Sequence, residues 1–278
     1  MYKNQFLCIV FLIWAGSSLA QKDSTHQLVL PVQPMYKINY KVEVPITVVG
    51  AGITLINFAG ISKKTTSTQA QIDSLSESNI PWFDRWTVHE YSNSIDQASY
   101  IPFYLAIPLP LLSLVDKNMR RDFWKIGYLY LEALTATGVL YSTAVNLTNR
   151  YRPFTYNKNS SLEKAEESNS KKSFFAGHVA LVATSSFFMA KVYAQYYPDS
   201  KLKWVFYGGA GIMTAATAVM RNLAGMHFLS DVLLGAGVGM LSGILVPGLH
   251  KIKPGKKPHL SFLPYGDGLA GFTAIYKF

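Results

Sequence analysis

Residues 204–250 read WVFYGGAGIMTAATAVMRNLAGMHFLSDVLLGAGVGMLSGILVPGLH. Two apolar stretches, Trp204–Met220 and Leu229–His250, are joined here by the polar segment Arg221–Asp231. A helix that crosses a bilayer needs about 20 mostly apolar residues. The sequence therefore predicts two membrane-crossing helices, with reactive side chains gathered where they meet.

Four more apolar stretches lie upstream: Pro45–Ile61, Ser99–Val115, Phe123–Leu147 and Phe174–Tyr197. The first is short and rich in glycine, so we predict an all-α polytopic membrane bundle of five to six spans. Composition agrees, because 49% of the 278 residues are hydrophobic and 15% are charged, whereas soluble domains average about 25% charged. At this length one bundle is favoured over two separate domains.

The chain begins MYKNQFLCIVFLIWAGSSLAQK. This segment follows the pattern of a secretory signal: Lys3 comes first, then an apolar run, then small residues up to Ala20. The alternative is an uncleaved membrane anchor. Cys8 is the one cysteine, so a cleaved chain has no thiol and no disulfide. We divide the chain into a signal or anchor (1–20), an N-terminal segment with a polar connection (21–97), a helix-bundle core (98–250) and a tail (251–278). Within the tail, His259–Phe278 is expected to form a short strand or to be disordered.

The net charge of +10 is compatible with binding to nucleic acid, to an anionic membrane surface or to a phosphate-bearing substrate. No nucleic-acid-binding motif interrupts the apolar runs, so we assign the charge to the membrane and to phosphate. Basic clusters at 117–125, 201–203 and 251–257 belong in the cytoplasm by the positive-inside rule. A cleaved signal followed by a full span at Pro45–Ile61 gives the opposite orientation. We give the charges more weight because that stretch is short.

Three polar clusters stand at the ends of apolar stretches. They are Asn149–Phe154 (NRYRPF), Ser173–His178 (SFFAGH) and Arg221–Asp231 (RNLAGMHFLSD). Residues 152–178 form a single loop, and two further spans return the chain to the same side. We therefore expect all three clusters on one face of the membrane. Glu132, inside a span, is expected to face the bundle interior as a hydrogen-bonding residue.

The residue types in these clusters suit phosphoryl transfer. Arg152 and Arg221 can bind phosphate through two forks of charge-assisted bonds, and the Gly177 amide can bind an anion at a helix N-terminus. His227 and Asp231 are four residues apart and share a helix face, so the carboxylate can hold one ring nitrogen while the other attacks phosphorus. His178 can protonate the leaving oxygen.

Each residue also has a simpler interpretation. Arginines at helix ends near lipid are usually interfacial anchors, and a His–Asp pair at this spacing can cap a helix. A metal site of two histidines and one acid is disfavoured by the two arginines nearby. Because both arginines end spans, we expect little effect on folding when either is replaced.

The three clusters together resemble the type 2 phosphatidic acid phosphatase superfamily, which includes bacterial acid phosphatases and vanadium haloperoxidases. Arg152-Pro153 fits the first family motif, Gly177-His178 the end of the second, and Arg221, His227 and Asp231 the third. The resemblance spans about Phe123 to His250 and is strongest to membrane-bound bacterial lipid phosphatases. It implies His227 as nucleophile, Asp231 as its orienter and His178 as the acid. It also implies that Arg152, Arg221 and the Gly177 amide hold the phosphate.

The sequence departs from the family pattern at three places. The motif lysine becomes Val145, the Pro-Ser pair becomes Phe175-Ala176, and the serine before the arginine becomes Met220. Arg150, Lys171 and Lys172 are candidates to replace the missing cation.

From this resemblance we expect a metal-independent phosphatase of the bacterial inner membrane, with its site facing the periplasm and no cofactor. Its substrate would be a lipid-linked phosphomonoester or diphosphate, hydrolysed through a phosphohistidine. Two alternatives stay open: a phosphate-lipid-binding protein that has lost turnover, favoured by Val145, Ala176 and Met220, and a lipid phosphotransferase. Haloperoxidase activity belongs to soluble members of the superfamily. Which lipid is bound, and the oligomeric state, are not specified by the sequence.

Overall fold

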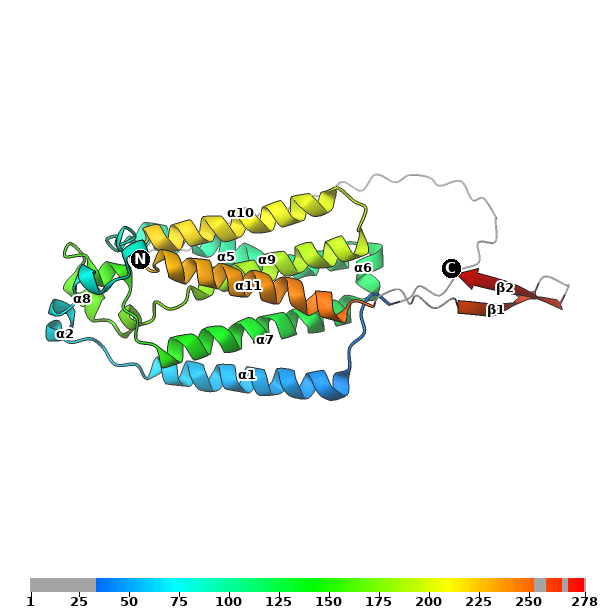
Figure 1. The fold of residues 1–278 in the computed structure, drawn as a ribbon, viewed down its shortest axis with the longest axis horizontal. Coiled ribbons are helices and arrows are strands. Elements are labelled where there is room, and N and C mark those ends of the chain that lie inside the picture. The colour runs from blue at the N-terminus through cyan, green and yellow to red at the C-terminus, as the bar shows by residue number, and fades with distance from the viewer. Residues whose placement is uncertain (1–33, 253–258, 267–269, 278) are drawn as a thin grey trace, which may run out of the picture. The chain divides into compact units, whose positions relative to one another are not determined.

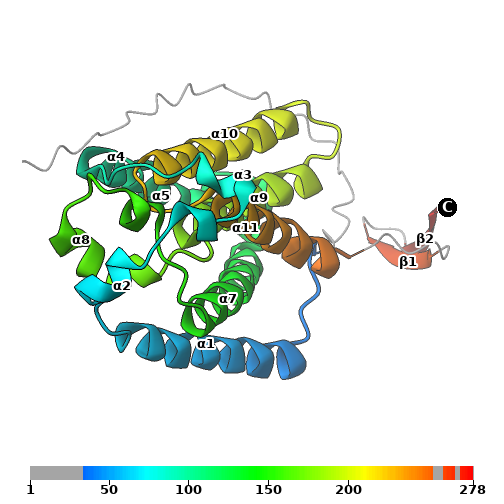
Figure 2. The ribbon, with the colours of Figure 1, turned by 60° about the vertical axis from the view of Figure 1, so that its left-hand side comes forward.

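The computed structural model describes residues 34–252, 259–266 and 270–277, and these are almost all helical (Figure 1). The predicted all-α class is confirmed. Its long helices are α1 (Tyr40–Ser62), α7 (Phe123–Leu147), α9 (Gly177–Tyr196), α10 (Leu202–Leu223) and α11 (Leu229–His250). Helix α9 packs against α7, α10 and α11, and α1 packs on the far side of α7 (Figures 1 and 2).

Short helices fill the connections between the long ones. They are α2 (Gln69–Asp73), η1 (Glu77–Asn79), α3 (Trp82–Arg85), α4 (Asn93–Ala98), α5 (Tyr100–Ala106), η2 (Leu109–Leu114), α6 (Lys117–Arg121), η3 (Pro153–Tyr156), α8 (Leu162–Glu166) and η4 (Ser168–Lys171). The predicted span at Ser99–Val115 is thus broken near Pro108 and Pro110, because proline lacks the amide that an α-helix needs. In the tail, strands β1 (His259–Gly266) and β2 (Ala270–Lys277) pair antiparallel.

Three helical segments in the described part of the chain are long and apolar enough to cross a membrane: Tyr40–Ser62, Asn93–Leu114 and Leu229–His250. Helices α7, α9 and α10 have 25, 20 and 22 residues and are less apolar. Polar side chains inside the bundle account for part of the difference, as where Thr137 and Thr184 share a hydrogen bond of 2.7 Å between α7 and α9. The predicted ends of α7 and α11 agree with the structure.

Helix α1 corrects one expectation. We took its region as short, but α1 has 23 residues, or about 34 Å at 1.5 Å per residue, which exceeds a hydrocarbon core of about 30 Å. Pro45 is the sixth residue of α1, so the helix lacks the amide that would donate to the Lys41 carbonyl but continues past it. Much of its outer surface is exposed and apolar, as at Leu55 and Ile56. The argument that this stretch is too short to cross is therefore wrong.

Helices α9 and α11 approach closely along a stripe of glycines. A Cβ atom at Gly235, Gly239 or Gly243 of α11 would lie 2.6, 2.1 or 2.5 Å from a backbone oxygen of α9 or of its N-cap, Ala176. The three glycines are four residues apart and so share one face. Small residues at this spacing let helix backbones pack together without hydrophobic side chains between them. This contact fixes the start of α11 beside the start of α9.

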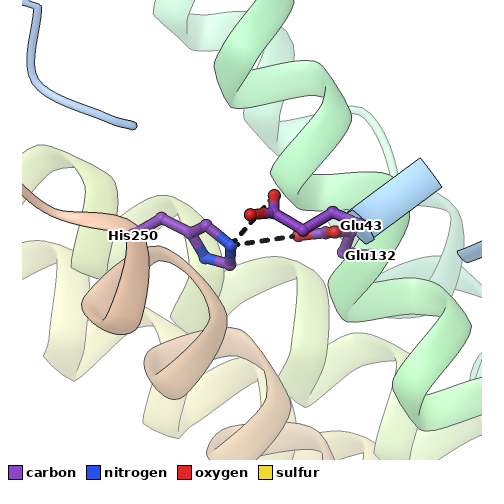
Figure 3. Close-up of side chains that lie close together, drawn as sticks. All are labelled: Glu43, Glu132 and His250. Carbon is purple, nitrogen blue, oxygen red and sulfur yellow. Dashed lines mark ion pairs between the residues drawn. The ribbon is translucent and has the colours of Figure 1, made fainter. Parts of the chain in front are cut away.

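Glu132 makes the structural contacts that we expected of it (Figure 3). Its carboxylate accepts a hydrogen bond from Thr47 of α1 at 3.4 Å and lies 3.7 Å from the His250 ring, which is 3.2 Å from Glu43. A histidine between two carboxylates joins α1, α7 and α11.

One end of the bundle carries the basic clusters identified in the sequence. The start of α1 and the end of α11 lie together, since the Lys37 amide donates to the His250 carbonyl at 3.0 Å. Near that end stand the basic residues Lys37, Lys41, Lys117, Arg120, Arg121, Lys125, Lys201, Lys203 and Lys251. The polar clusters predicted to carry chemistry lie at the other end. The signal or anchor at 1–20, with Cys8, falls outside the described residues.

Candidate active site

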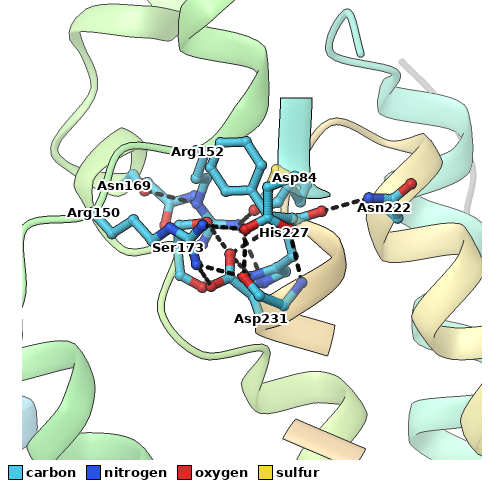
Figure 4. A network of polar contacts seen from close by, with 11 residues as sticks. Asp84, Arg150, Arg152, Asn169, Ser173, Asn222, His227 and Asp231 are labelled. Atoms are coloured by element: carbon cyan, nitrogen blue, oxygen red, sulfur yellow. Dashed lines mark hydrogen bonds and ion pairs between the residues drawn. The ribbon is translucent and has the colours of Figure 1, made fainter. Parts of the chain in front are cut away.

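The three polar clusters meet at one end of the bundle (Figure 4). The segment after α7 supplies Arg150 and Arg152, the segment before α9 supplies Ser173, and the turn between α10 and α11 supplies His227. That turn depends on Gly225, whose φ of 70° is unfavourable for other residues. The expectation that the clusters share one side of the bundle is confirmed.

His227 is buried, and its two ring nitrogens have different partners. Nδ1 lies 2.7 Å from the Ser173 carbonyl oxygen, and Nε2 lies 3.5 Å from a guanidinium nitrogen of Arg152. A carbonyl can only accept, so the proton is on Nδ1 and the lone pair of Nε2 is free. Burial, and then the charges of Arg152 and Arg221, hold the pKa of His227 well below 6.5. The imidazole is therefore neutral near pH 7.

Asp231 does not hold His227 directly. Its Oδ2 atom is 4.0 Å from Nδ1 of the ring, too far for a hydrogen bond. The carboxylate instead accepts from the Ser173 hydroxyl at 2.6 Å and from the Phe228 amide at 3.1 Å. Asp231 thus fixes Ser173, and the Ser173 carbonyl fixes the histidine. The expected direct contact is replaced by this two-step arrangement.

Arg152 is buried with its guanidinium at the site. It donates to the Asn169 carbonyl at 2.8 Å, to the Asn169 side chain at 3.1 Å and to the Met226 carbonyl at 3.0 Å. Burial, and then the charge of Arg221, lower the pKa of Arg152 to about 10. It remains a cation at neutral pH, and all its acceptors are uncharged.

Arg221 is 1% exposed and ends α10. One of its guanidinium nitrogens forms an ion pair with Asp96 of α4 and donates to Ser99 at 3.1 Å. Its Nε atom is buried and has no hydrogen-bond partner within the described residues. A buried donor without an acceptor is costly. The pair with Asp96 corrects the expectation that Arg221 contributes little to folding.

His178 and Gly177 form the first turn of α9. The His178 ring packs against Tyr100 and Phe103 of α5, with ring centroids 4.8 Å apart in both pairs. A Cβ atom at Gly177 would lie 2.5 Å from the ring of Tyr141 in α7. Glycine is therefore required here for close packing of α9 on α7, in addition to leaving its amide accessible at a helix N-terminus.

Among the candidate replacements for the missing lysine, Lys172 fits best. Val145, at the family position, is buried and apolar. Arg150 is committed elsewhere, because it pairs with Asp84 at 2.7 Å and Asp231 at 2.5 Å. Lys172 is half-buried, and burial followed by the Arg152 charge lowers its pKa. A second cation therefore stands near Arg152.

Sequence reasoning missed several residues of this network. Asp84 accepts from the Ser230 hydroxyl at 2.6 Å and the Ser230 amide at 2.9 Å besides pairing with Arg150. Asp96 pairs with Arg221, and Asn222 donates to the His227 carbonyl at 2.9 Å. Asp84 and Asp96 lie in the connection after α1, which we expected only to link spans. The neighbours of Asp84 give no local sign of its burial, since Trp82 and Phe83 are 78% and 41% exposed.

We predict that the two arginines differ on replacement. Arg152→Ala should remove phosphate contacts of about 1.5 to 3 kcal/mol, the usual range for bonds to charged groups, and change thermal stability little because its acceptors are uncharged. Arg221→Ala should reduce the free energy of phosphate binding by a similar amount. It should also destabilise the fold, because Asp96 loses its buried partner. Steady-state kinetics and thermal denaturation in detergent separate the effects. Equal melting temperatures for the two variants would contradict this distinction.

Residues 127–253 match the family model of the PAP2 superfamily. The resemblance predicted from the motifs is thus confirmed over nearly the same span. Comparison with curated proteins gives no match. Among solved structures, the chain is similar to a transmembrane PAP2 type phosphatidylglycerolphosphate phosphatase from Bacillus subtilis, with 21% identity and a TM-score of 0.43 over 72% of this chain and 94% of that one. The PAP2 region contains every predicted site residue.

Proposed function

We propose that this protein is a membrane phosphatase that hydrolyses a lipid-linked phosphomonoester or diphosphate through a phosphohistidine on His227. The observation that carries the proposal is the free Nε2 atom of His227. It lies 3.5 Å from Arg152, while Nδ1 is held at 2.7 Å by the Ser173 carbonyl. A neutral, fixed imidazole facing a cation is suited to attack a phosphate that the cation binds.

In the first step the Nε2 lone pair attacks phosphorus, and the bond from phosphorus to the leaving oxygen breaks. The imidazole becomes cationic, and its Nδ1 proton stays bonded to the Ser173 carbonyl. His178 donates a proton to the leaving oxygen. A bound phosphate adds negative charge beside His178, which favours its protonated form. Water then gives a proton to the now neutral His178 and attacks phosphorus. The N–P bond breaks with its electron pair returning to Nε2, inorganic phosphate leaves, and His178 is protonated again.

Cations hold the phosphate oxygens during both steps. Arg152 and Arg221 are buried and can form charge-assisted bonds, and the unpartnered Nε of Arg221 is available as a donor. Lys172 takes the place of the family's lysine. Because these groups are fixed by Asn169, Met226 and Asp96, they need little reorganisation as charge develops.

A lipid substrate is supported by the position of the site at one end of a bundle with three candidate spans. The resemblance suggests phosphatidic acid, phosphatidylglycerol phosphate, isoprenyl diphosphate or a lipid A phosphate. The direct test is phosphate release from a panel of these lipids by the purified protein. Vanadate, which can adopt the five-coordinate geometry of the transition state, should inhibit competitively, and chelators should have no effect. If no lipid releases phosphate while vanadate still binds, the protein is a phosphate-lipid-binding protein and the proposal fails. Transfer of the phosphoryl group to an acceptor other than water would indicate a phosphotransferase.

We also propose that the site faces the periplasm of the bacterial inner membrane, because the basic clusters at 117–125 and 201–203 lie at the other end of the bundle. Since α1 is long enough to cross, this orientation requires the residues before α1 to stay on the cytoplasmic side. In a Cys8→Ser background, Lys158→Cys at the site end should react with a membrane-impermeant thiol reagent in intact cells. Lys201→Cys at the opposite end should react only after lysis. Both side chains are exposed, so accessibility to solvent is matched. The reverse pattern of labelling would place the site in the cytoplasm.

A further inference from the structure

A second basic pocket lies beside the candidate active site, where the ends of α1 and α7 meet the segment that follows α7. Its volume is about 480 Å³. The lining includes Lys63, Lys64, Gln71, Asn149, Tyr151 and Lys171. Three lysines therefore converge on one cavity.

These lysines have no acidic partners. Lys171 is 9% exposed, and its ammonium donates only to the Thr66 carbonyl at 3.3 Å and the Gln71 side-chain oxygen at 3.4 Å. Lys64 donates to the Thr148 carbonyl and to Asn149. Across the described residues, no ion pair includes Lys63, Lys64 or Lys171. Buried charges such as that of Lys171 are normally paired, so an anion bound in the pocket would supply the counter-charge that the described residues do not.

The neighbouring lysines repel the charge of Lys64. Burial, and then the charges of Lys172 and Lys171, lower the pKa of its ammonium. Like charges held close together disfavour the charged form, and an anion among them reverses the effect. The gathering of lysines is thus unfavourable alone and favourable with a bound anion.

The pocket and the active site lie on opposite sides of one stretch of backbone. Thr148 and Arg152 have extended conformations, and successive side chains of an extended segment point to opposite sides. Asn149 and Tyr151 line the pocket, whereas Arg150 and Arg152 belong to the active-site network. An anion in the pocket is therefore separate from the phosphate attacked by His227.

The surroundings of the pocket favour a lipid as the source of the anion. Leu147, the last residue of α7, is 78% exposed, and Phe58 near the end of α1 is 44% exposed. Exposed apolar side chains therefore stand near the ends of both helices that border the cavity, where the acyl chains beneath a headgroup could contact them. We propose that this pocket binds the phosphate headgroup of an anionic phospholipid that is not itself hydrolysed.

Binding can be tested without turnover in an Arg152→Ala/His227→Ala background, which removes the nucleophile and weakens phosphate binding at the active site. Short-chain phosphatidylglycerol, its phosphatidylcholine counterpart and inorganic phosphate are titrated calorimetrically in a non-ionic detergent. Phosphatidylglycerol should bind, and Lys63→Gln/Lys64→Gln/Lys171→Gln should raise its Kd at least about tenfold, as expected when bonds between charged groups are lost. Rising salt should weaken binding to the parent protein.

The matched control is Lys117→Gln/Lys158→Gln/Lys201→Gln, which removes the same charge at exposed positions outside the pocket and should leave the Kd unchanged. If the buried Lys171 proves necessary for folding, Lys63→Gln/Lys64→Gln keeps it and should still weaken binding. Equal affinities in pocket and control variants, or no binding to the parent protein, would overturn the proposal. So would inorganic phosphate binding as tightly as phosphatidylglycerol, since the lipid would then contribute nothing. A failure of catalysis leaves this test unaffected.

Discussion

Replacing His227 by alanine should abolish phosphate release, with a loss on the order of 10⁴-fold or more, as for other enzymes that lose a nucleophile. The reason is that Nε2 of His227 supplies the electron pair for the covalent step. Parent protein incubated with a ³²P-labelled lipid phosphate and quenched should show a phosphoenzyme that is labile to acid and stable to base. The His227→Ala form should show none.

Two controls test whether activity is lost through misfolding or another non-specific effect of substitution. His259→Ala lies in β1, outside the PAP2 region, and should retain the phosphoenzyme. Thermal denaturation of His227→Ala checks that the fold survives, because the buried ring bonds to Ser173. A phosphoenzyme that persists in folded His227→Ala would exclude this residue as the nucleophile, whatever the substrate.

The largest expected effect on stability follows from Arg150→Ala. Arg150 pairs with Asp84 and Asp231, and both carboxylates are fully buried. It also lies over the Phe228 ring, 4.5 Å from its centroid. Removing one partner of a buried ion pair usually costs 3 to 5 kcal/mol, and since Arg150 is 23% exposed we expect about 3 kcal/mol.

This loss is measurable as a lower melting temperature in detergent, with Arg120→Ala as a control that removes an exposed arginine. Arg150→Lys should recover only part of the stability, because one ammonium cannot make two divergent bonds as a guanidinium does. Asp84→Asn combined with Arg150→Ala should be less destabilised than the sum of the single variants, since fewer charges are left unpaired. An unchanged melting temperature for Arg150→Ala would show that the two carboxylates are compensated by other groups.

Local patterns in the sequence determined the helices and the identity of the reactive residues. A run of about 20 apolar residues predicts a helix whatever surrounds it, and the ends of α7 and α11 were predicted correctly on this basis. The spacing of Arg152, Gly177-His178 and Arg221–Asp231 likewise predicted one phosphate site at one end. Helix α1 was underestimated at its start, because Lys41, Glu43 and Pro45 interrupt the apolar run there without preventing a helix.

Tertiary structure alone decided which groups hold these residues. His227 and Asp231 share a helix-like spacing, yet the ring is held by Ser173, 54 residues away, because His227 lies in the turn before α11 begins. Asp84 and Asp96 reach Arg150 and Arg221 across 66 and 125 residues. Such pairings depend on how the connection after α1 folds over the bundle end. Burial there leaves each guanidinium and carboxylate with the other as its available counter-charge, and no local pattern of residues encodes that choice.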